Sequence, residues 1–179
     1  MKKLCSRFFL LFMLLALSAC MSGDHVFRIS QDSLQTKLRE KLPVTKSYLR
    51  IFQVTLENPR VALHEGSDRI HLGLEVAVRI LNAPEPLRGE IDVSGGLRYD
   101  HPQGAFYLVT PTLERMNLHN LPEQYREPAH TVLSGLLTEY CATHPLYVLD
   151  AKKRDQTPEN MQLKNVRVEN GELALTFGQ

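Results

Sequence analysis

The sequence predicts an α+β domain in which helices pack against one face of an antiparallel sheet. Two periodic segments carry this prediction. Apolar side chains alternate with other residues from Ile70 to Leu81, the pattern of a strand about 40 Å long at 3.3 Å per residue. Apolar side chains recur at spacings of three and four residues from Tyr125 to Tyr140, which predicts a long amphipathic helix. The connections between strands are too short for parallel crossovers.

The two helices have recognisable ends. A short helix is predicted over 31–41, because Ser30 is a favourable N-cap and Pro43 disfavours a helical conformation in the residue before it. The long helix runs to about residue 143 and begins after Pro122, a residue that is well tolerated in a first helical turn. Pro128 falls inside this pattern, so it is expected to kink the helix or delay its start.

Further strands are predicted on both sides of the central alternating run. Gly95-Gly96 interrupts one of them and indicates a bulge or bend. Asn170-Gly171 lies between two alternating runs, which is typical of a β-hairpin turn. The charged segment 150–160 is expected to be a loop. The remaining predicted strands are 48–57 and 60–64, separated at Asn58-Pro59, then 91–99, 105–113, 146–149 and the two arms of the hairpin over 166–177.

The N-terminus resembles the signal of a bacterial lipoprotein. Basic residues precede an uncharged run over 8–17, which is about half the roughly 20 residues that a membrane-spanning helix needs. The run closes on Leu-Ser-Ala-Cys, which resembles a lipobox, so we expect residues 1–19 to be cleaved and Cys20 to be lipid-modified. Residues 20–25 would then form a short tether, and 26–179 a single domain. The alternative is an ordinary secretory signal in which the cysteine stands by chance.

Charge and cysteine content exclude several classes of partner. Loss of residues 1–19 lowers the 21 Lys and Arg residues to 18, against 20 Asp and Glu, so the formal charge changes from +1 to −2. A chain with this balance has no strong field to attract nucleic acid. After cleavage Cys141 is the one thiol not expected to carry lipid, so an internal disulfide is not predicted. A buried, structural thiol is the preferred reading of Cys141.

The sequence contains no recognisable catalytic or metal motif. Seven histidines are scattered without the H-x-x-x-H or H-E-x-x-H spacing of a metal site. A nucleophile elbow, an S-x-x-K pair and a phosphate-binding loop are all missing. We therefore predict no catalytic residue, no metal and no cofactor, and a protein that is not an enzyme.

The remaining candidate site is an apolar seam. One face of the predicted strand over 70–80 matches the apolar stripe of the long helix in length. These faces either form a closed core or leave an elongated groove for a lipid-like ligand, since ligand pockets are lined mainly by such groups. The candidate ligand-lining residues are Leu72, Leu74, Val76, Val78, Leu133, Leu136, Leu137 and Tyr140.

Several segments resemble the YceB-like family of bacterial lipoproteins. They are the run from Ile29-Ser30 to Leu42-Pro43, then Asn58 to Val61, Gly104 to Leu108, Pro145 to Leu149 and the hairpin from Leu163 to Phe177. The resemblance implies a tubular lipid-binding fold of the BPI type, in which a twisted antiparallel sheet wraps around a long helix. That superfamily includes binders and carriers of lipids. The resemblance implies no catalytic residues.

Together these patterns predict a lipoprotein that binds or shuttles an apolar ligand. Met21 rather than Asp follows Cys20, which by resemblance to lipoprotein sorting signals indicates the outer membrane and its periplasmic face. The expected partners are the membrane, through the lipid on Cys20, and an apolar ligand. The alternative is an envelope interaction or assembly factor with a fully packed core and no ligand. The sequence identifies neither the ligand nor a protein partner.

Overall fold

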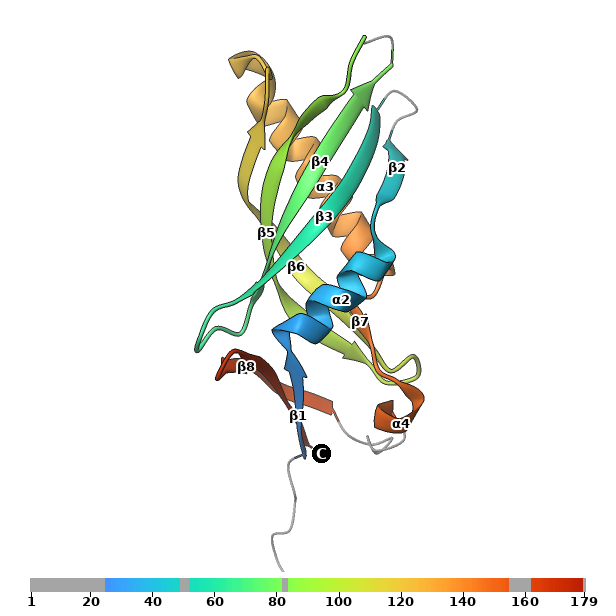
Figure 1. Cartoon of the computed structure of the whole chain (residues 1–179), viewed down its shortest axis with the longest axis vertical. Coiled ribbons are helices and arrows are strands. Elements are labelled where there is room, and N and C mark those ends of the chain that lie inside the picture. The colour runs from blue at the N-terminus through green and yellow to red at the C-terminus, as the bar shows by residue number, and fades with distance from the viewer. Residues whose placement is uncertain (1–24, 49–51, 82–83, 155–161, 179) are drawn as a thin grey trace, which may run out of the picture.

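The computed structural model describes residues 25–48, 52–81, 84–154 and 162–178, and within them the strands form two antiparallel sheets (Figure 1). The larger sheet has the order β2-β3-β4-β5-β6-β7 and the smaller one the order β1-β9-β8. The predicted signal peptide and Cys20 lie outside the described residues. The strands are β1 (His25–Ser30), β2 (Val44–Tyr48), β3 (Phe52–Leu63), β4 (Ile70–Ile80), β5 (Leu87–Asp100), β6 (Ala105–Leu118), β7 (Tyr147–Val148), β8 (Gln162–Glu169) and β9 (Glu172–Gly178).

The short N-terminal helix is confirmed as α2 (Gln31–Lys41). Ser30 caps it, because the backbone N–H of Ser33 donates to its Oγ at 3.2 Å. Leu34 and Leu38 are buried and anchor the helix in the core. The α+β class predicted from the sequence is therefore correct at this end of the chain.

The long helix starts later than its apolar pattern. A short 3-10 turn, η2 (Glu123–Tyr125), precedes α3 (Arg126–Thr143). Pro128 is the third residue of α3, where a backbone N–H would have no partner within the helix, so the proline is accommodated in the first turn. Pro128 was expected either to kink the helix or to delay its start, and the structure shows a delayed start. In Figure 1, α3 runs along one face of the six-stranded sheet.

Strand β4 lies between β3 and β5 in the larger sheet and has the predicted alternation. Ile70, Leu72, Leu74 and Val76 are buried, while the residues between them are partly exposed. Because successive side chains in a strand point to opposite faces, these apolar residues share the face that packs in the core.

The predicted break at Asn58-Pro59 is wrong. Residues 52–63 form one strand, β3, whose pairing with β4 shifts register between Glu57 and Arg60. Gln35 of α2 stabilises this bulge: its Nε2 donates to the Pro59 carbonyl at 2.5 Å, and its Oε1 accepts from the Val61 N–H at 2.8 Å. A side chain from outside the sheet thus satisfies the backbone groups that the bulge frees. The sequence also gave no prediction for β2, which pairs with β3.

The predicted bulge at Gly95-Gly96 is confirmed. The pairing of β5 with β6 shifts register between Ser94 and Gly96. A Cβ atom on Gly95 would lie 2.6 Å from Cγ of Leu108, so the close approach of the two strands requires glycine there. Strand β6 continues to Leu118, beyond the predicted end at residue 113.

The smaller sheet joins the two ends of the described chain. The β8–β9 hairpin is confirmed, with positive φ angles of 54° at Asn170 and 73° at Gly171. The pairing of β1 with β9 was not predicted. Phe177 of β9 is fully buried, and its ring centroid lies 5.0 Å from that of Tyr99 in β5, so aromatic packing connects the two sheets. The short helix α4 (Ala151–Arg154) forms where the sequence predicted a loop.

Candidate functional site

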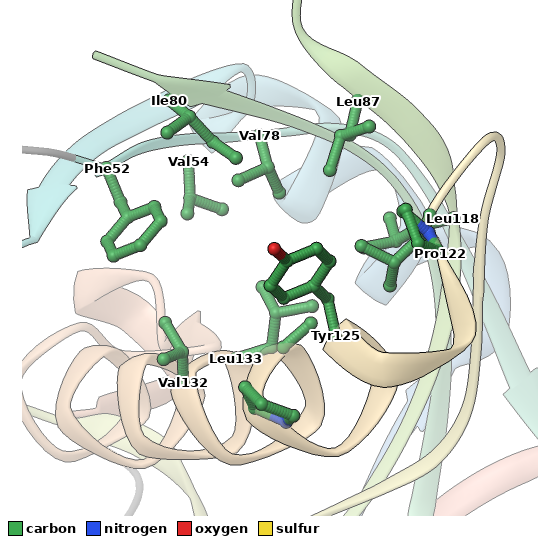
Figure 2. A pocket seen from close by; sticks show the side chains of 13 residues that line it. Phe52, Val54, Val78, Ile80, Leu87, Leu118, Pro122, Tyr125, Val132 and Leu133 are labelled. Carbon is green, nitrogen blue, oxygen red and sulfur yellow. The ribbon is translucent and has the colours of Figure 1, made fainter. Parts of the chain in front are cut away.

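A cavity of about 440 Å³ lies between the larger sheet and the start of α3 (Figure 2). Strands β3, β4, β5 and β6 form one wall, and η2 and α3 form the other. Thirteen residues line it, and their side chains are all apolar except for one tyrosine hydroxyl. They are Phe52, Val54, Val78, Ile80, Leu87, Leu118, Leu121, Pro122, Tyr125, Pro128, Ala129, Val132 and Leu133.

The sheet wall of this large cavity follows from strand register. Val54, Val78 and Leu87 are directly paired across β3, β4 and β5, so their side chains point to the same face of the sheet. Phe52 and Ile80 form the next such pair on that face. The sequence alternation therefore continues into the cavity wall at the strand ends.

The helical wall follows from helical periodicity. Ala129, Val132 and Leu133 of α3 are three and four residues apart and line the cavity as one stripe. Figure 2 shows Val132 and Leu133 on the helical side of the cavity. Leu133 is buried, whereas Val132 is half-buried. The stripe predicted from the sequence thus packs in the core at its centre and lines the cavity at its N-terminal end.

Tyr125 is the one lining residue that carries a polar side-chain atom. It is the last residue of η2, its side chain is directed into the space between sheet and helix, and it remains 52% exposed (Figure 2). A half-exposed aromatic ring at the start of α3 can contact an apolar ligand with its face and water with its hydroxyl.

Two smaller voids continue from the large cavity along α3. The first, of about 30 Å³, shares Val54 and Leu133 with the large cavity and also contacts Lys46. The second, of about 60 Å³, shares Leu137 and Tyr140 with the first. Free space between sheet and helix therefore narrows sharply toward the C-terminal end of α3.

The candidate residues from the sequence are distributed over these three spaces. Val78 and Leu133 line the large cavity. Val76 is only 2% exposed and lines neither the large cavity nor the two voids, so it belongs to the packed core. The 60 Å³ void is lined by Leu72, Leu74, Leu137 and Tyr140. The 30 Å³ void is lined by Leu136, Leu137 and Tyr140, together with Leu133, which also lines the large cavity. Whether any of them contacts a ligand stays a prediction.

Several cavity residues that the sequence patterns did not indicate lie at element ends. Leu87 begins β5, Leu118 ends β6, and Tyr125 belongs to the turn before α3. Periodicity is hard to read there because each run is short. One signal for these cavity residues was available in the sequence. Apolar residues continue to the end of the strand and into the following turn, as at Leu118 and Leu121.

Burial shifts the titration of groups beside the 60 Å³ void. It raises the pKa of the Cys141 thiol to about 11 and also raises the pKa of Tyr140. It lowers the pKa of Lys41, whose Nζ donates to the carbonyls of Pro145 at 2.6 Å and Leu146 at 3.3 Å. A thiol with a raised pKa is a poor nucleophile, which agrees with a structural role for Cys141.

The buried polar side chain of Ser94 has structural partners. The buried Ser94 accepts from Arg69 and donates to Glu114 at the β5 bulge, so its hydroxyl is held in place within the sheet. In the described ranges, no group of three or more His, Cys, Asp and Glu residues could hold a metal ion. No helix of the described chain is long and apolar enough to cross a membrane.

Comparison with known proteins gives a family without a described activity. The profile of a family described as "Protein of unknown function (DUF1439)" matches residues 29–172. No curated protein matches the chain. A crystal structure of a lipopolysaccharide binding protein aligns with a TM-score of 0.32 and 15% identity, over 85% of this chain and 40% of the other. The chain thus spans less than half of that protein, and at this TM-score the two folds are not shown to be the same.

Proposed function

The chain belongs to the DUF1439 family, and we propose that it is a membrane-anchored lipoprotein that binds an apolar, lipid-like ligand in the large cavity. One observation carries the proposal: a cavity of about 440 Å³ whose wall contains a single polar side-chain atom. Its volume falls within the range of roughly 300–1,000 Å³ that is typical of small-molecule sites. The apolar lining selects a ligand that is itself largely hydrocarbon.

The physical argument concerns the cost of leaving this space unfilled. The cavity is partly open to solvent, so without a ligand its apolar wall faces water, which costs about 25 cal/mol per Å² of apolar surface. Water that enters meets a single polar side-chain atom in the wall. A hydrocarbon chain would remove this apolar surface from water. The cavity therefore favours ligand binding over an interaction protein with a fully packed interior.

The anchor and the cavity would lie at opposite ends of the molecule in this proposal. Leu87 of the cavity wall is twelve residues from Tyr99 along β5, or about 40 Å at 3.3 Å per residue. Tyr99 packs on Phe177, which pairs with His25, the first described residue. Figure 1 likewise has β1 at one end and the start of α3 at the other. With lipid on Cys20, the cavity would face away from the anchoring outer membrane toward the periplasm.

This arrangement suits a carrier that exchanges its ligand across the periplasm. A short tether from Cys20 would hold β1 near the bilayer, and the sheet, curving around α3, would present the cavity to a second membrane or protein. The proposal assigns no enzymatic step to the chain. The sole covalent chemistry in it is the lipid modification of Cys20.

Native mass spectrometry tests the proposal. Residues 21–179 are isolated from the bacterial envelope under non-denaturing conditions, and bound molecules are released in the gas phase and identified. The proposal predicts a population of protein with one bound lipid or fatty acid, which is depleted in Val78→Phe. Protein that is consistently free of lipid, and that acquires none from added fatty acid, would contradict it.

A further inference from the structure

One row of paired residues crosses the larger sheet from its edge into the cavity. Lys46 pairs with Val54, Val54 with Val78, and Val78 with Leu87, so these four side chains share one face of β2, β3, β4 and β5. Three strand spacings of about 4.8 Å give the row a length of roughly 14 Å. The row places a lysine at the sheet edge and three cavity-lining apolar residues behind it.

The 30 Å³ void contacts both this lysine and two residues of the cavity wall. It is lined by Lys46 on one side and shares Val54 and Leu133 with the large cavity on the other. Its volume of about 30 Å³ holds roughly one methylene-sized group, if a methylene is taken to occupy about as much space as a water molecule. Leu136 and Tyr140 on its wall are half-buried, so rotamer changes at the surface can widen it without a shift of the backbone.

Lys46 has no acidic partner in the described part of the chain. Some other surface cations have one: Lys37 pairs with Glu40 and Arg60 with Glu90. The Nζ atom of Lys46 instead lies 3.5 Å from Nε2 of His144 and 5.9 Å from the centre of the Tyr140 ring.

The contact with His144 leaves part of the Lys46 ammonium group available to an anion. The Nζ atom of Lys46 can donate one hydrogen to Nε2 of His144, whose Nδ1 lies 2.8 Å from Oγ1 of Thr143 and 3.1 Å from the Tyr140 carbonyl. One of the three ammonium hydrogens of Lys46 is used in this way. The other two are available to an external acceptor.

We propose that the ligand is a single-chain amphiphile with an anionic head group, held with its head at Lys46 and its tail in the large cavity. This inference rests on the proposed function and narrows the ligand class. At about 30 Å³ per methylene, the volume of the cavity corresponds to roughly 15 carbons, which is the size of one acyl chain. The lining contains no charged residue, so a charged head group must lie outside the cavity.

Photo-crosslinking of the full chain in phosphatidylcholine vesicles tests this inference. The probes are diazirine-labelled palmitate, hexadecyl phosphate and hexadecanol, which share a tail length and differ in the charge and chemistry of the head group. The variants are Lys46→Met and the matched control Lys164→Met, an exposed lysine in β8 of the other sheet. Crosslinked peptides are identified by mass spectrometry, and yields are compared at equal probe content of the membrane.

The inference predicts that Lys46→Met lowers crosslinking of an anionic probe about fivefold, the effect expected for one exposed charge pair, and leaves hexadecanol unchanged. Lys164→Met should resemble the wild type. If Lys46→Met lowers the crosslinking yield of both palmitate and hexadecyl phosphate, the site recognises negative charge as such. If it lowers the yield of only one of these probes, that probe identifies the head group. Equal behaviour of charged and neutral probes in Lys46→Met would overturn the inference.

Failure of the proposed function gives a different result. In that case no probe labels peptides of β4 or α3, or the labelling of these peptides is the same in Val78→Phe as in the wild type. Labelling that Val78→Phe reduces for every probe, and that Lys46→Met reduces for none, would support the cavity as the binding site and overturn the head-group assignment.

Discussion

Val76 and Val78 are two residues apart on the same face of β4, yet Val78 lines the large cavity and Val76 is packed in the core. The strand thus changes from closed to open packing within one repeat of its alternation. This pair gives a matched test of whether the free volume exists in solution.

Substitution with phenylalanine should separate the two positions. Val76→Phe inserts extra carbon atoms into a filled core, so we expect a loss of about 1–3 kcal/mol in the free energy of unfolding. Val78→Phe can direct its ring into the cavity, and its loss should stay below about 1 kcal/mol. Urea denaturation of both variants measures the difference. Equal destabilisation would show that the cavity is closed in solution.

The connection between the sheets should depend on Phe177. Its ring is fully buried against Tyr99 and lies 6.4 Å from Phe106 between centroids. Phe177→Ala should lower the free energy of unfolding by about 3–5 kcal/mol, because it removes a large core side chain. Val26→Ala, at a position that is 53% exposed in the same sheet, is the control and should change it by less than about 0.5 kcal/mol. A small effect of Phe177→Ala would mean that the smaller sheet contributes little to stability.

The half-buried thiol of Cys141 should react slowly. With a pKa of about 11, its thiolate fraction at pH 8 is roughly a hundred times lower than that of an exposed cysteine. Iodoacetamide labelling, read at the peptide that contains Cys141, should therefore be slow in the folded protein and fast in urea. Equal rates in the two states would contradict the burial of this residue.

Stability should fall in mild acid through His71. Its ring lies 4.3 Å from that of His64, between centroids, and burial followed by the charge of His64 lowers its pKa below 6.5. Since the unfolded chain takes up the proton more readily, the contribution of His71 is complete above pH 6.5 and is lost as the pH falls toward the folded pKa. Glu114 and Asp92 oppose this shift, whereas Arg69 adds to it.

Urea midpoints at pH 7.5 and pH 5.0 measure this effect. The wild type should lose more stability between the two values than His71→Gln does. His130→Gln changes an exposed histidine of α3 and should behave like the wild type. A wild type and a His71→Gln variant with the same pH dependence would exclude a role for this pair.

Local signals in the sequence predicted the elements that local interactions determine. The N-cap Ser30 and the turn Asn170-Gly171 fix their helix and hairpin through neighbouring residues, and both predictions were correct. The pairing of β1 with β9 joins residues such as His25 and Phe177, which are far apart in the chain. No periodic pattern contains that information. The bulge at Pro59 was missed for the same reason, because Gln35 of another element stabilises it.

The sequence indicated an apolar seam between sheet and helix but did not locate the free space along it. The sequence indicated that β4 and α3 face each other with apolar side chains, and residues of both elements line the large cavity and the 60 Å³ void. Near Leu137 little space is left. The 440 Å³ cavity lies near Leu118 and Tyr125, where the start of β5 and the end of β6 meet η2. Its position depends on how elements that are distant in the chain come together, so no single segment reveals it.

Titration with cis-parinaric acid, a fluorescent single-chain fatty acid, tests the central claim most directly. Residues 21–179 should show a saturable rise in fluorescence with one site per chain. Val78→Phe should weaken binding at least about tenfold while its urea midpoint stays close to that of the wild type. No saturable binding by the wild type, or equal binding by the wild type and Val78→Phe, would contradict the assignment of the cavity as a lipid site.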